Sequence, residues 1–541
     1  MGIYVIKSFK GALSDYNDKG TPGSYKFGYN LDPRKKADTL SAGQALIDEG
    51  ILASSSPSRS VSPSASVSPS ASPSPTASPS ASQSPSSSPS ASASPSTGIS
   101  PSPSLSPSAS ASPSASTSPS HSASRSPSPS SGLDTVFDDL ILFFVEADDG
   151  YVYGFGDTGS IYRRNSDGFW VRVYKDPNGK IKGATQWYTN DGIVWLYWAT
   201  DTLEFRKNIN GDASWNDVET VGNLVSADWH THQLVGGALV IANARLIAYV
   251  GYDGSFTPEA TDLIPGNLSK TIVERNGRAI IGTVRASDPS KGVNGAIDSE
   301  VPLSQVGDDG EVFFSNMADS LPVVRFPGGG KVNPGGVTNL LKEINFFEWE
   351  EGASSWIDKQ SVGNLSLFGV FSADTDKNGI YSYGRKFKNA PFVLNLEYKL
   401  EVDEIGAIIS TLGLVLASYK DGSDFGVKAT DPNNKATAVY EGLEFPSPVK
   451  IPHDITTYSM VLITFDPLPN GSSIEFWYKM NATGNFVQTE TDANQVQFSD
   501  AGKTWAVFLV ADSGDIYEPR VVINPIGNLS PQIRTIETLF E

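Results

Sequence analysis

Short apolar runs alternate with turns rich in Gly, Asn and Asp throughout residues 133–450, and no long stretch follows a 3.6-residue period. Alternation over a few residues between turn signals is typical of β-strands, whereas a helix needs a sustained apolar stripe. This part of the chain is therefore predicted to be all-β.

Hairpins built around small turn residues recur along this stretch. The strongest turn signal is Asn276-Gly277, because a type I′ turn needs positive φ at both central residues. Four segments show the hairpin pattern: Gln233–Ile241, Val273–Ile281, Val362–Phe368 and Ile408–Leu416.

Repeated hairpins at regular spacing predict a β-propeller for residues 133–450. At about 45–50 residues per blade, this length corresponds to six or seven blades. Stacking four-stranded blades in a ring covers both apolar faces of each blade and leaves only short edges exposed. A multi-sheet β-sandwich is the competing arrangement, but it explains the recurrent hairpins less well.

Residues 451–541 are predicted to form a separate C-terminal β-sandwich. About 90 residues suffice for a small module of this kind. The strand-like runs are Val461–Phe465, Ile474–Tyr478, Trp505–Val510 and Arg520–Ile523.

Residues 53–132 consist almost entirely of Ser, Pro and Ala and contain no Asp or Glu. Such a composition has almost nothing apolar to bury, so we expect a disordered, solvated insertion with polyproline II character. A passive spacer is the favoured interpretation, ahead of a glycan-bearing stalk or a sticky surface brush. If the tract is an insertion within one domain, Leu52 and Asp134 should lie close together, which loop-closure entropy permits.

Residues 1–52 are too few to bury a useful core alone, so they should dock on or complete the propeller. We expect a strand from Ile3–Phe9 or Ala37–Ile47 to pair with the propeller and to close the ring against its last blade.

The chain has a net charge of −20 and no Cys. Phosphate contacts need clustered Lys and Arg, so nucleic-acid binding is not expected. The lack of Cys excludes disulfides, thiolate zinc sites and a cysteine nucleophile. No apolar run is long enough for a transmembrane helix, and the first 20 residues lack the pattern of a signal peptide.

Two short motifs could hold a metal ion. Asp374, Asp376 and Asn378 resemble the opening of a calcium loop, but Arg385 stands where an EF-hand needs Glu, and a hairpin turn is the favoured interpretation. His230 and His232 alternate along a predicted strand without an evident third ligand, so we interpret them as half-exposed strand residues. We therefore assign no metal site and no cofactor.

No sequence motif singles out catalytic or sugar-binding residues. The stretch Asp500–Trp505 resembles the Asp-box turn of sialidase-type propellers, which is structural even where it is genuine. The 60 Asp and Glu residues offer many possible carboxylate pairs for glycoside hydrolysis, but none stands in a distinctive context. Packing between blades explains the conspicuous tryptophans better than sugar stacking does; they are Trp187, Trp195, Trp198 and Trp229. We assign no catalytic residue.

The N-terminal stretch Ile6–Ser14, followed by Gly28–Arg34, resembles the opening of bacteriophage virion proteins that carry a β-propeller, including nozzle-type tail proteins of short-tailed phages. Ala12 stands where those proteins usually have a second Gly. The blocks Tyr153–Arg164, Ile380–Arg385, Ile474–Tyr478 and Asn524–Asn528 are similar to uncharacterised phage proteins. The resemblance implies a virion tail component and brings no known active site with it.

The leading hypothesis is therefore a structural or adsorption-related phage tail protein that is not an enzyme. It would be made in the host cytoplasm and reside in the virion. Its expected partners are other tail proteins, further copies of itself and a host glycan or receptor. The alternatives are a virion-associated propeller that binds or cleaves glycans, and a cell-surface adhesin with a Ser/Pro stalk.

Overall fold

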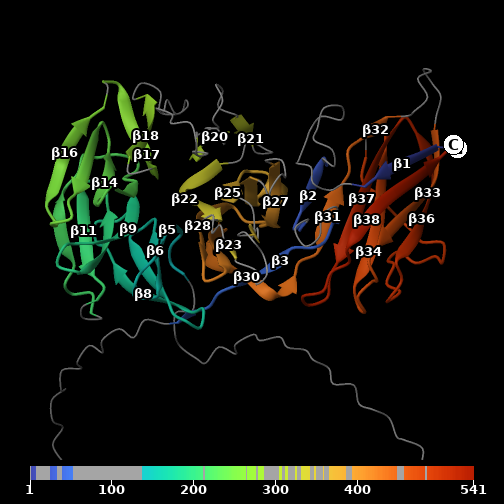
Figure 1. Ribbon diagram of the computed structural model, residues 1–541, viewed down its shortest axis with the longest axis horizontal. Helices are drawn as coiled ribbons and strands as arrows, with labels where there is room; N and C mark the ends of the chain where they lie inside the picture. Colours follow the sequence, from blue (N-terminus) through green and yellow to red (C-terminus); the bar gives the residue numbers. More distant parts are fainter. Residues whose placement is uncertain are drawn as a thin grey trace, which may run out of the picture. The chain divides into compact units, whose positions relative to one another are not determined.

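Strands form nearly all of the regular structure (Figure 1). The computed structural model describes residues 2–7, 25–32, 39–52, 137–210, 214–263, 265–275, 278–285, 304–306, 311–314, 323–325, 331–340, 347–348, 357–358, 365–384, 393–446, 456–481 and 484–541. The chain divides into two units, Met1–Ser54 with Leu133–Glu541 and Ser55–Gly132, and the second lies outside the described residues. The described part contains no α-helix, only the 3-10 turn η1 (Thr375–Lys377). The all-β prediction is confirmed.

Antiparallel four-stranded sheets follow one another from residue 141 onward, and we call them blades. The first blade contains β5 (Ile141–Glu146), β6 (Val152–Gly156), β7 (Ser160–Arg164) and β8 (Trp170–Lys175). The second contains β9 (Gly183–Tyr188), β10 (Val194–Ala199), β11 (Leu203–Asn208) and β12 (Glu219–Asn223). The third contains β13 (His232–Val235), β14 (Ala238–Asn243), β15 (Leu246–Val250) and β16 (Phe256–Asp262).

The remaining sheets of this region come from residues 267–435. Its last blade contains β28 (Glu404–Thr411), β29 (Leu414–Asp421) and β30 (Asp424–Lys435). The sheet before it contains β22 (Lys331–Leu340), β25 (Leu365–Phe371), β26 (Gly379–Gly384) and β27 (Val393–Lys399). Shorter sheets are formed by β17 (Asn267–Arg275) with β18 (Arg278–Arg285), by β19 (Ser304–Val306), β20 (Glu311–Phe314) and β21 (Val323–Arg325), and by β23 (Phe347–Glu348) with β24 (Ile357–Asp358).

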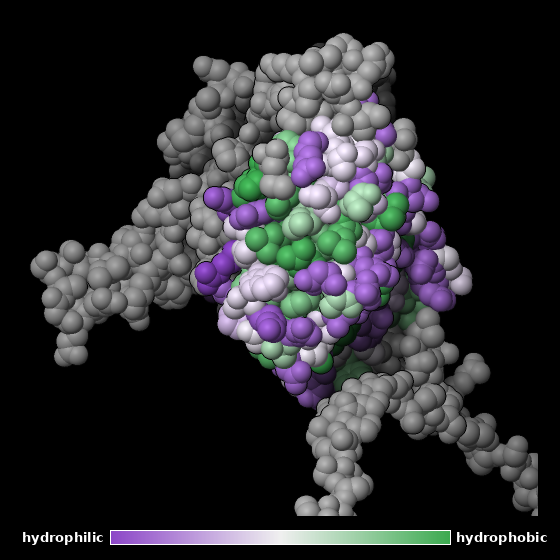
Figure 2. Space-filling view, turned by 90° about the vertical axis from the view of Figure 1, so that its right-hand side faces the viewer, coloured by the Kyte–Doolittle hydropathy of each residue, from purple (hydrophilic) through white to green (hydrophobic). Residues whose placement is uncertain are grey.

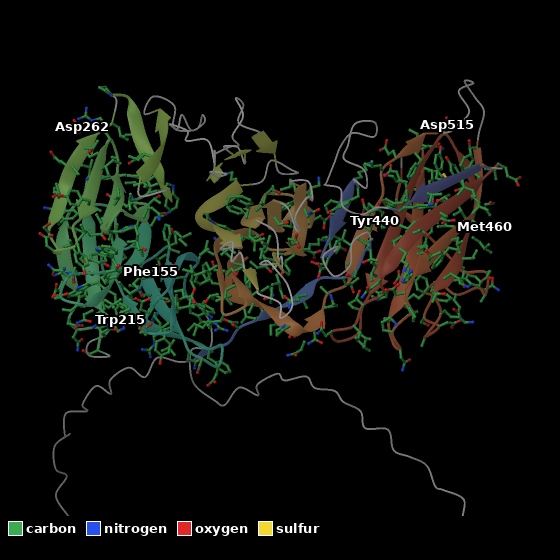
Figure 3. The ribbon with its side chains drawn as sticks, viewed as in Figure 1. Phe155, Trp215, Asp262, Tyr440, Met460 and Asp515 are labelled. Carbon is green, nitrogen blue, oxygen red and sulfur yellow. The ribbon has the colours of Figure 1, made fainter. Side chains whose placement is uncertain are left out.

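Neighbouring blades pack face to face, as a ring of stacked sheets requires. Strand β10 is buried at every position: Trp198 packs against Phe155 of the first blade, which Figure 3 labels, whereas Trp195 packs with Leu239 of the third. A further cluster joins the first blade to the last, with Trp170 packed with Leu416. The first and last blades therefore share a core, as the closure of a propeller ring requires.

This arrangement confirms the prediction of a β-propeller followed by a β-rich C-terminal region. The predicted hairpins Gln233–Ile241 and Ile408–Leu416 are present, and their turn residues Gly236, Gly237, Leu412 and Gly413 all have positive φ. Strands β17 and β18 pair as predicted for the segment Val273–Ile281, whose Asn276-Gly277 turn lies outside the described residues. The remaining segment, Val362–Phe368, enters β25, which begins at Leu365. The expected blade count involves residues 286–364, which fall largely outside the described ranges.

The C-terminal region is formed by two sheets around one core. The β33 sheet contains β33 (Thr456–Phe465), β36 (Trp505–Gly514), β38 (Ile533–Phe540) and, at its edge, β1 (Gly2–Ile6). The β37 sheet contains β31 (Ala438–Glu441), β32 (Phe445–Pro446), β34 (Ser473–Met480), β35 (Val487–Thr489) and β37 (Ile516–Asn524). Side chains of both sheets, such as Ile463 and Phe476, meet in the core. Strands β31 and β32 come from the N-terminal side of residue 451, the expected start of the sandwich.

The N-terminal segment crosses the whole first unit. Strand β1 pairs with β38, and β2 (Phe27–Tyr29) lies between β27 and β31, which joins the propeller to the β37 sheet. Strand β3 (Gln44–Asp48) is the fourth, outermost strand of the last blade, and β4 (Ile51–Leu52) pairs with β8 of the first blade. The segment therefore bridges the last and first blades where the ring closes.

A buried ion pair fixes this closure. Glu49, between β3 and β4, accepts hydrogen bonds from Arg164 Nε at 2.8 Å and from Trp170 Nε1 at 2.8 Å. The side chains of Glu49 and Arg164 are only 6% and 8% exposed. The amide of Trp170 also donates to the carbonyl oxygen of Gly50 at 2.9 Å. We call these contacts the N-terminal latch.

Both described ends that flank the Ser/Pro/Ala tract meet at Trp170. Ile51, one residue before Leu52, pairs with Trp170, and the ring of Phe137 lies 6.2 Å from the Trp170 ring. Asp134 itself lies outside the described residues. The chain thus leaves and re-enters the first unit at the same blade.

Candidate functional site

The residues of the calcium-like motif make hydrogen bonds and an ion pair with other groups of the protein. Asn378 accepts a hydrogen bond from the Ser372 amide at 2.7 Å and donates to the Val402 carbonyl at 2.8 Å. Asp374 pairs with Lys377 at 2.9 Å, and this contact lowers the pKa of Asp374. These contacts shape the turn around η1. Among the described residues, no group of three or more His, Asp or Glu side chains is arranged to hold a metal ion.

His230 and His232 do not converge on a common point either. His230 is fully buried, with Nδ1 2.8 Å from the Ala242 carbonyl and Nε2 3.0 Å from the Asp201 carbonyl. Burial lowers its pKa. His232 Nε2 lies 2.9 Å from Glu204 Oε1, and both side chains are completely buried between the second and third blades. The expectation of half-exposed side chains is therefore wrong for both histidines, and only their distant partners could have indicated this.

The conspicuous tryptophans are packing residues. Trp187, Trp195 and Trp198 are buried, and Trp198 Nε1 donates to Asp176 at 2.7 Å. Trp229 packs at the edge of the cluster between the first two blades, with Lys180 Nζ 5.0 Å from its ring centre. These rings hold blades together, as the sequence predicts.

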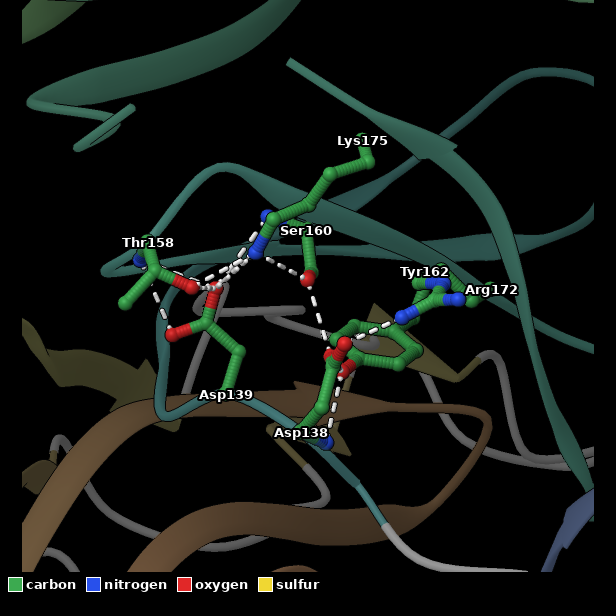
Figure 4. A network of polar contacts seen from close by, with 7 residues as sticks. All are labelled: Asp138, Asp139, Thr158, Ser160, Tyr162, Arg172 and Lys175. Carbon is green, nitrogen blue, oxygen red and sulfur yellow. Dashed lines mark hydrogen bonds and ion pairs between the residues drawn. The ribbon is translucent and has the colours of Figure 1, made fainter. Parts of the chain in front are cut away.

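A network of polar contacts fastens the start of the first blade (Figure 4). Asp139 is buried and accepts hydrogen bonds from the Thr158 amide at 2.8 Å, the Thr158 hydroxyl at 2.8 Å and the Ser160 amide at 3.1 Å. Burial raises the pKa of Asp139 despite these donors. A Cβ on Gly156 would stand 2.3 Å from its carboxylate, which shows how tightly Asp139 is enclosed.

The adjacent Asp138 completes this network. It accepts hydrogen bonds from the Ser160 hydroxyl at 2.9 Å and the Tyr162 hydroxyl, and it pairs with Arg172 (Figure 4). Burial by itself would raise the pKa of Asp138, but the Tyr162 and Ser160 hydrogen bonds and the Arg172 charge outweigh it and lower the pKa. Both carboxylates are committed to holding the turn between β6 and β7, so this pair is structural.

A groove of about 610 Å³ lies where the N-terminal segment meets the last blade. On one side, Lys399 Nζ lies 4.8 Å from the ring centre of Tyr29 and pairs with Glu401 at 2.5 Å. The Asn30 side chain, in a residue with positive φ, accepts a hydrogen bond from the Lys399 amide and so fixes this wall.

The opposite wall has the same composition. Lys428 Nζ lies 5.0 Å from the ring centre of Tyr419 and pairs with Asp48 of β3 at 2.8 Å. Tyr419 donates a hydrogen bond to the same carboxylate at 2.8 Å. Burial, and to a smaller extent this hydrogen bond, raise the pKa of Tyr419. The groove therefore offers charged groups that are already paired, together with two aromatic rings.

The most distinctive surface is the face of the β33 sheet that points away from the core. Four large apolar side chains of this face are strongly exposed: Ile3 at 54%, Val5 at 40%, Trp505 at 53% and Leu509 at 42%. Figure 2 looks onto this side of the molecule and shows a continuous apolar area bordered by polar residues. We call it the apolar face.

Register shows that these residues are neighbours. Ile3, Leu539, Met460 and Leu509 form one cross-strand row, and Figure 3 labels Met460 on this side. A second row contains Val5, Glu537, Leu462 and Val507. The turn Asp500–Trp505 leads into this face, and Trp505 is its most prominent residue.

Comparisons with known proteins give a limited result. No family model and no curated protein matches the chain. Among solved structures, a streptogramin B lyase is 12% identical over 54% of this chain and 94% of its own, with a TM-score of 0.33. The selenomethionine-substituted virginiamycin B lyase from Staphylococcus aureus is 13% identical over 55% and 96%, with a TM-score of 0.34. The Dos1 propeller is 11% identical over 54% and 78%, with a TM-score of 0.32.

This likeness establishes no activity for the chain. Among the described residues, no helix has the length and hydropathy to cross a membrane. Over the residues that the structure describes, the chain is an all-β protein with a β-propeller, a β-rich C-terminal region and an exposed apolar sheet face.

Proposed function

We propose that the chain is a structural component of a bacteriophage tail that serves in assembly or host adsorption and catalyses no reaction. It is made in the host cytoplasm and carried in the virion, where its partners are other tail proteins and further copies of itself. Its N-terminal stretch resembles that of phage virion propeller proteins, as described above.

The apolar face is the observation that carries this proposal. Monomeric soluble proteins rarely expose large contiguous apolar patches, and such patches mark docking sites. The strand β1 that contributes Ile3 and Val5 belongs to the same N-terminal segment that closes the propeller. The segment thus joins the docking face firmly to the rest of the unit.

Purified particles test the proposal. The chain should be found by mass spectrometry in gradient-purified virions, and antibodies against it should label the tail in electron micrographs. Leu509→Glu in the phage genome should reduce incorporation, because it places a charge in the apolar face. Leu412→Glu is the matched control, since Leu412 is 69% exposed in the turn between β28 and β29. A chain that is absent from purified particles would contradict the proposal.

The groove beside β3 supports a second candidate, a virion propeller that binds glycans. Its volume is within the range of small-molecule sites. Its paired ammonium and carboxylate groups could exchange hydrogen bonds with the hydroxyls of a neutral sugar. Binding of host glycans that is lost in Asp48→Ala but kept in Leu412→Glu would support this candidate, and glycan turnover would contradict the non-enzymatic proposal.

A further inference from the structure

The apolar face has the composition of a surface that another molecule covers. Strand β36 is apolar at six consecutive positions, Trp505–Val510, and only Ala506, Phe508 and Val510 point into the core. Strands that read as continuous apolar runs are normally buried on both faces. The alternate residues Trp505, Val507 and Leu509 therefore lack the cover that their sequence suggests.

Several polar groups of this face are hydrogen-bonded or paired within it. Thr464 and Thr535 share a hydrogen bond of 2.6 Å, and Thr535 donates to Glu537 at 3.3 Å. At the margin, Arg534 pairs with Asp466. Losing water from this face would therefore leave few hydrogen-bonding groups without a partner, which is the usual condition for a stable contact.

The face carries both halves of a complementary contact. Trp505 projects with 53% of its surface exposed. Its ring also forms one wall of a hollow of about 640 Å³, whose other walls include Leu462, Thr464, Asp466 and Arg534. A two-fold contact places the same patch of each copy against the other, so a projection and a hollow on one face can fill each other twice.

We propose that the apolar face binds a second copy of this chain, with Trp505 of each copy in the hollow of the other. This inference names the partner at the face and rests on the docking role under the proposed function. The local charge of the face permits a like partner here. The chain carries −20 overall, yet Glu537 is the one carboxylate in the two rows described, so this face lacks the acidity that would select a basic partner.

The area of the face sets the strength of the pair. With full areas of about 150–250 Å² for large side chains, the four strongly exposed residues present on the order of 400 Å². A standard interface buries about 800 Å² per partner, so the pair is at the small end of specific contacts. We expect a dissociation constant in the micromolar range, of about 1–100 μM.

Sedimentation velocity of the purified full-length chain tests this pairing. Wild type should shift from monomer to dimer across the micromolar range. Leu509→Glu should weaken the dimer at least about 30-fold, as expected for a charge introduced into the apolar part of an interface. Leu412→Glu makes the same change of charge elsewhere and should stay within about twofold of wild type. Circular dichroism and thermal unfolding of each variant establish that it is folded.

A single introduced cysteine locates the contact. Because the chain has no Cys, Val507→Cys provides one unique thiol on the apolar face. Oxidation should join two copies covalently through this residue, while Leu412→Cys should form no such cross-link under the same conditions. Wild type that remains monomeric at all concentrations, or a dimer that Leu509→Glu leaves unchanged, would overturn the inference.

Two outcomes separate this inference from the proposed function. If the isolated chain is monomeric but Leu509→Glu blocks incorporation into particles, the face binds a different tail protein. The second-copy inference then fails and the proposed function stands. If the dimer forms as expected but purified virions lack the chain, the inference stands and the proposed function fails.

Discussion

The N-terminal latch gives the sharpest test of how the ring is closed. Glu49→Gln keeps the shape of the side chain but removes the charge that faces Arg164, and it turns an amide toward donors of Arg164 and Trp170. Arg164 then remains buried, with 8% of its side chain exposed, beside a neutral partner. Breaking a buried pair in this way costs about 3–5 kcal/mol, because the remaining charge is left without compensation.

Urea unfolding measures this loss, and an exposed pair supplies the control. Arg245 and Asp262 are 3.4 Å apart, with side chains 50% and 63% exposed. Asp262→Asn should cost no more than about 1 kcal/mol, since exposed pairs contribute little. Hydrogen exchange adds a local readout, because the Trp170 amide is bonded to Gly50 and should exchange faster in Glu49→Gln.

A double variant separates the lost pair from the stranded charge. Glu49→Met with Arg164→Met removes both charges, and replacing a buried pair by apolar residues is often neutral. The double variant should therefore be more stable than Glu49→Gln. If Glu49→Gln loses no more free energy of unfolding than Asp262→Asn, or if the double variant is the least stable, the latch does not close the ring as argued.

Three further predictions follow from the same structure. Asp139→Asn should lower the free energy of unfolding by about 1–3 kcal/mol, because an amide group would then face the donors of Thr158 and Ser160; urea titration measures this. Burial lowers the pKa of His230 below its ordinary value of 6.5, so the unfolded chain takes up the proton first and stability falls as pH drops below that value. In urea titrations at several pH values, His230→Gln should remove this loss, which is at most about 1.4 kcal/mol per pH unit. Replacing Ser55–Gly132 by a linker of about 10 Gly and Ser residues should raise stability in urea by up to about 2 kcal/mol, because loop-closure entropy falls and both flanks already meet at Trp170. An unchanged urea midpoint in Asp139→Asn, an unchanged pH slope in His230→Gln, or unfolding of the shortened chain would each contradict its prediction.

Local signals explain how much of the fold the sequence predicts. The small residues at 236–237 and 412–413 mark hairpins because the turn requires positive φ, and the structure has those hairpins. The pairing of β3 with β30 depends on residues almost 400 positions apart in the chain. A short N-terminal segment shows that it must dock somewhere, but its pattern does not specify which strand receives it.

Candidate sites are harder to predict because each depends on a distant partner. Glu204 and Glu49 carry no local motif, yet one contacts His232 and the other holds Arg164 in the interior. Conversely, the aspartates near η1 match part of a calcium loop, but the carboxylate of Asp374 forms an ion pair with the neighbouring Lys377. Burial and pairing, which decide the role of a charged side chain, become visible only in three dimensions.

The apolar face is an exception, because its apolar character can be read from the sequence of one strand. Over Trp505–Val510, the outward-facing residues of β36 are all apolar, whereas those of β34 are mainly polar. In β34, Ile474, Phe476 and Tyr478 enter the core, while the opposite face has Glu475 and Lys479 on either side of a single apolar residue, Trp477. Strand β36 shows the same inward alternation but places Trp505, Val507 and Leu509 opposite. A strand that needed only to cover the core would gain solubility from polar residues there. The absence of that alternation in β36 is therefore a sequence signal of a second contact, and the second copy of the chain is the partner that we propose for it.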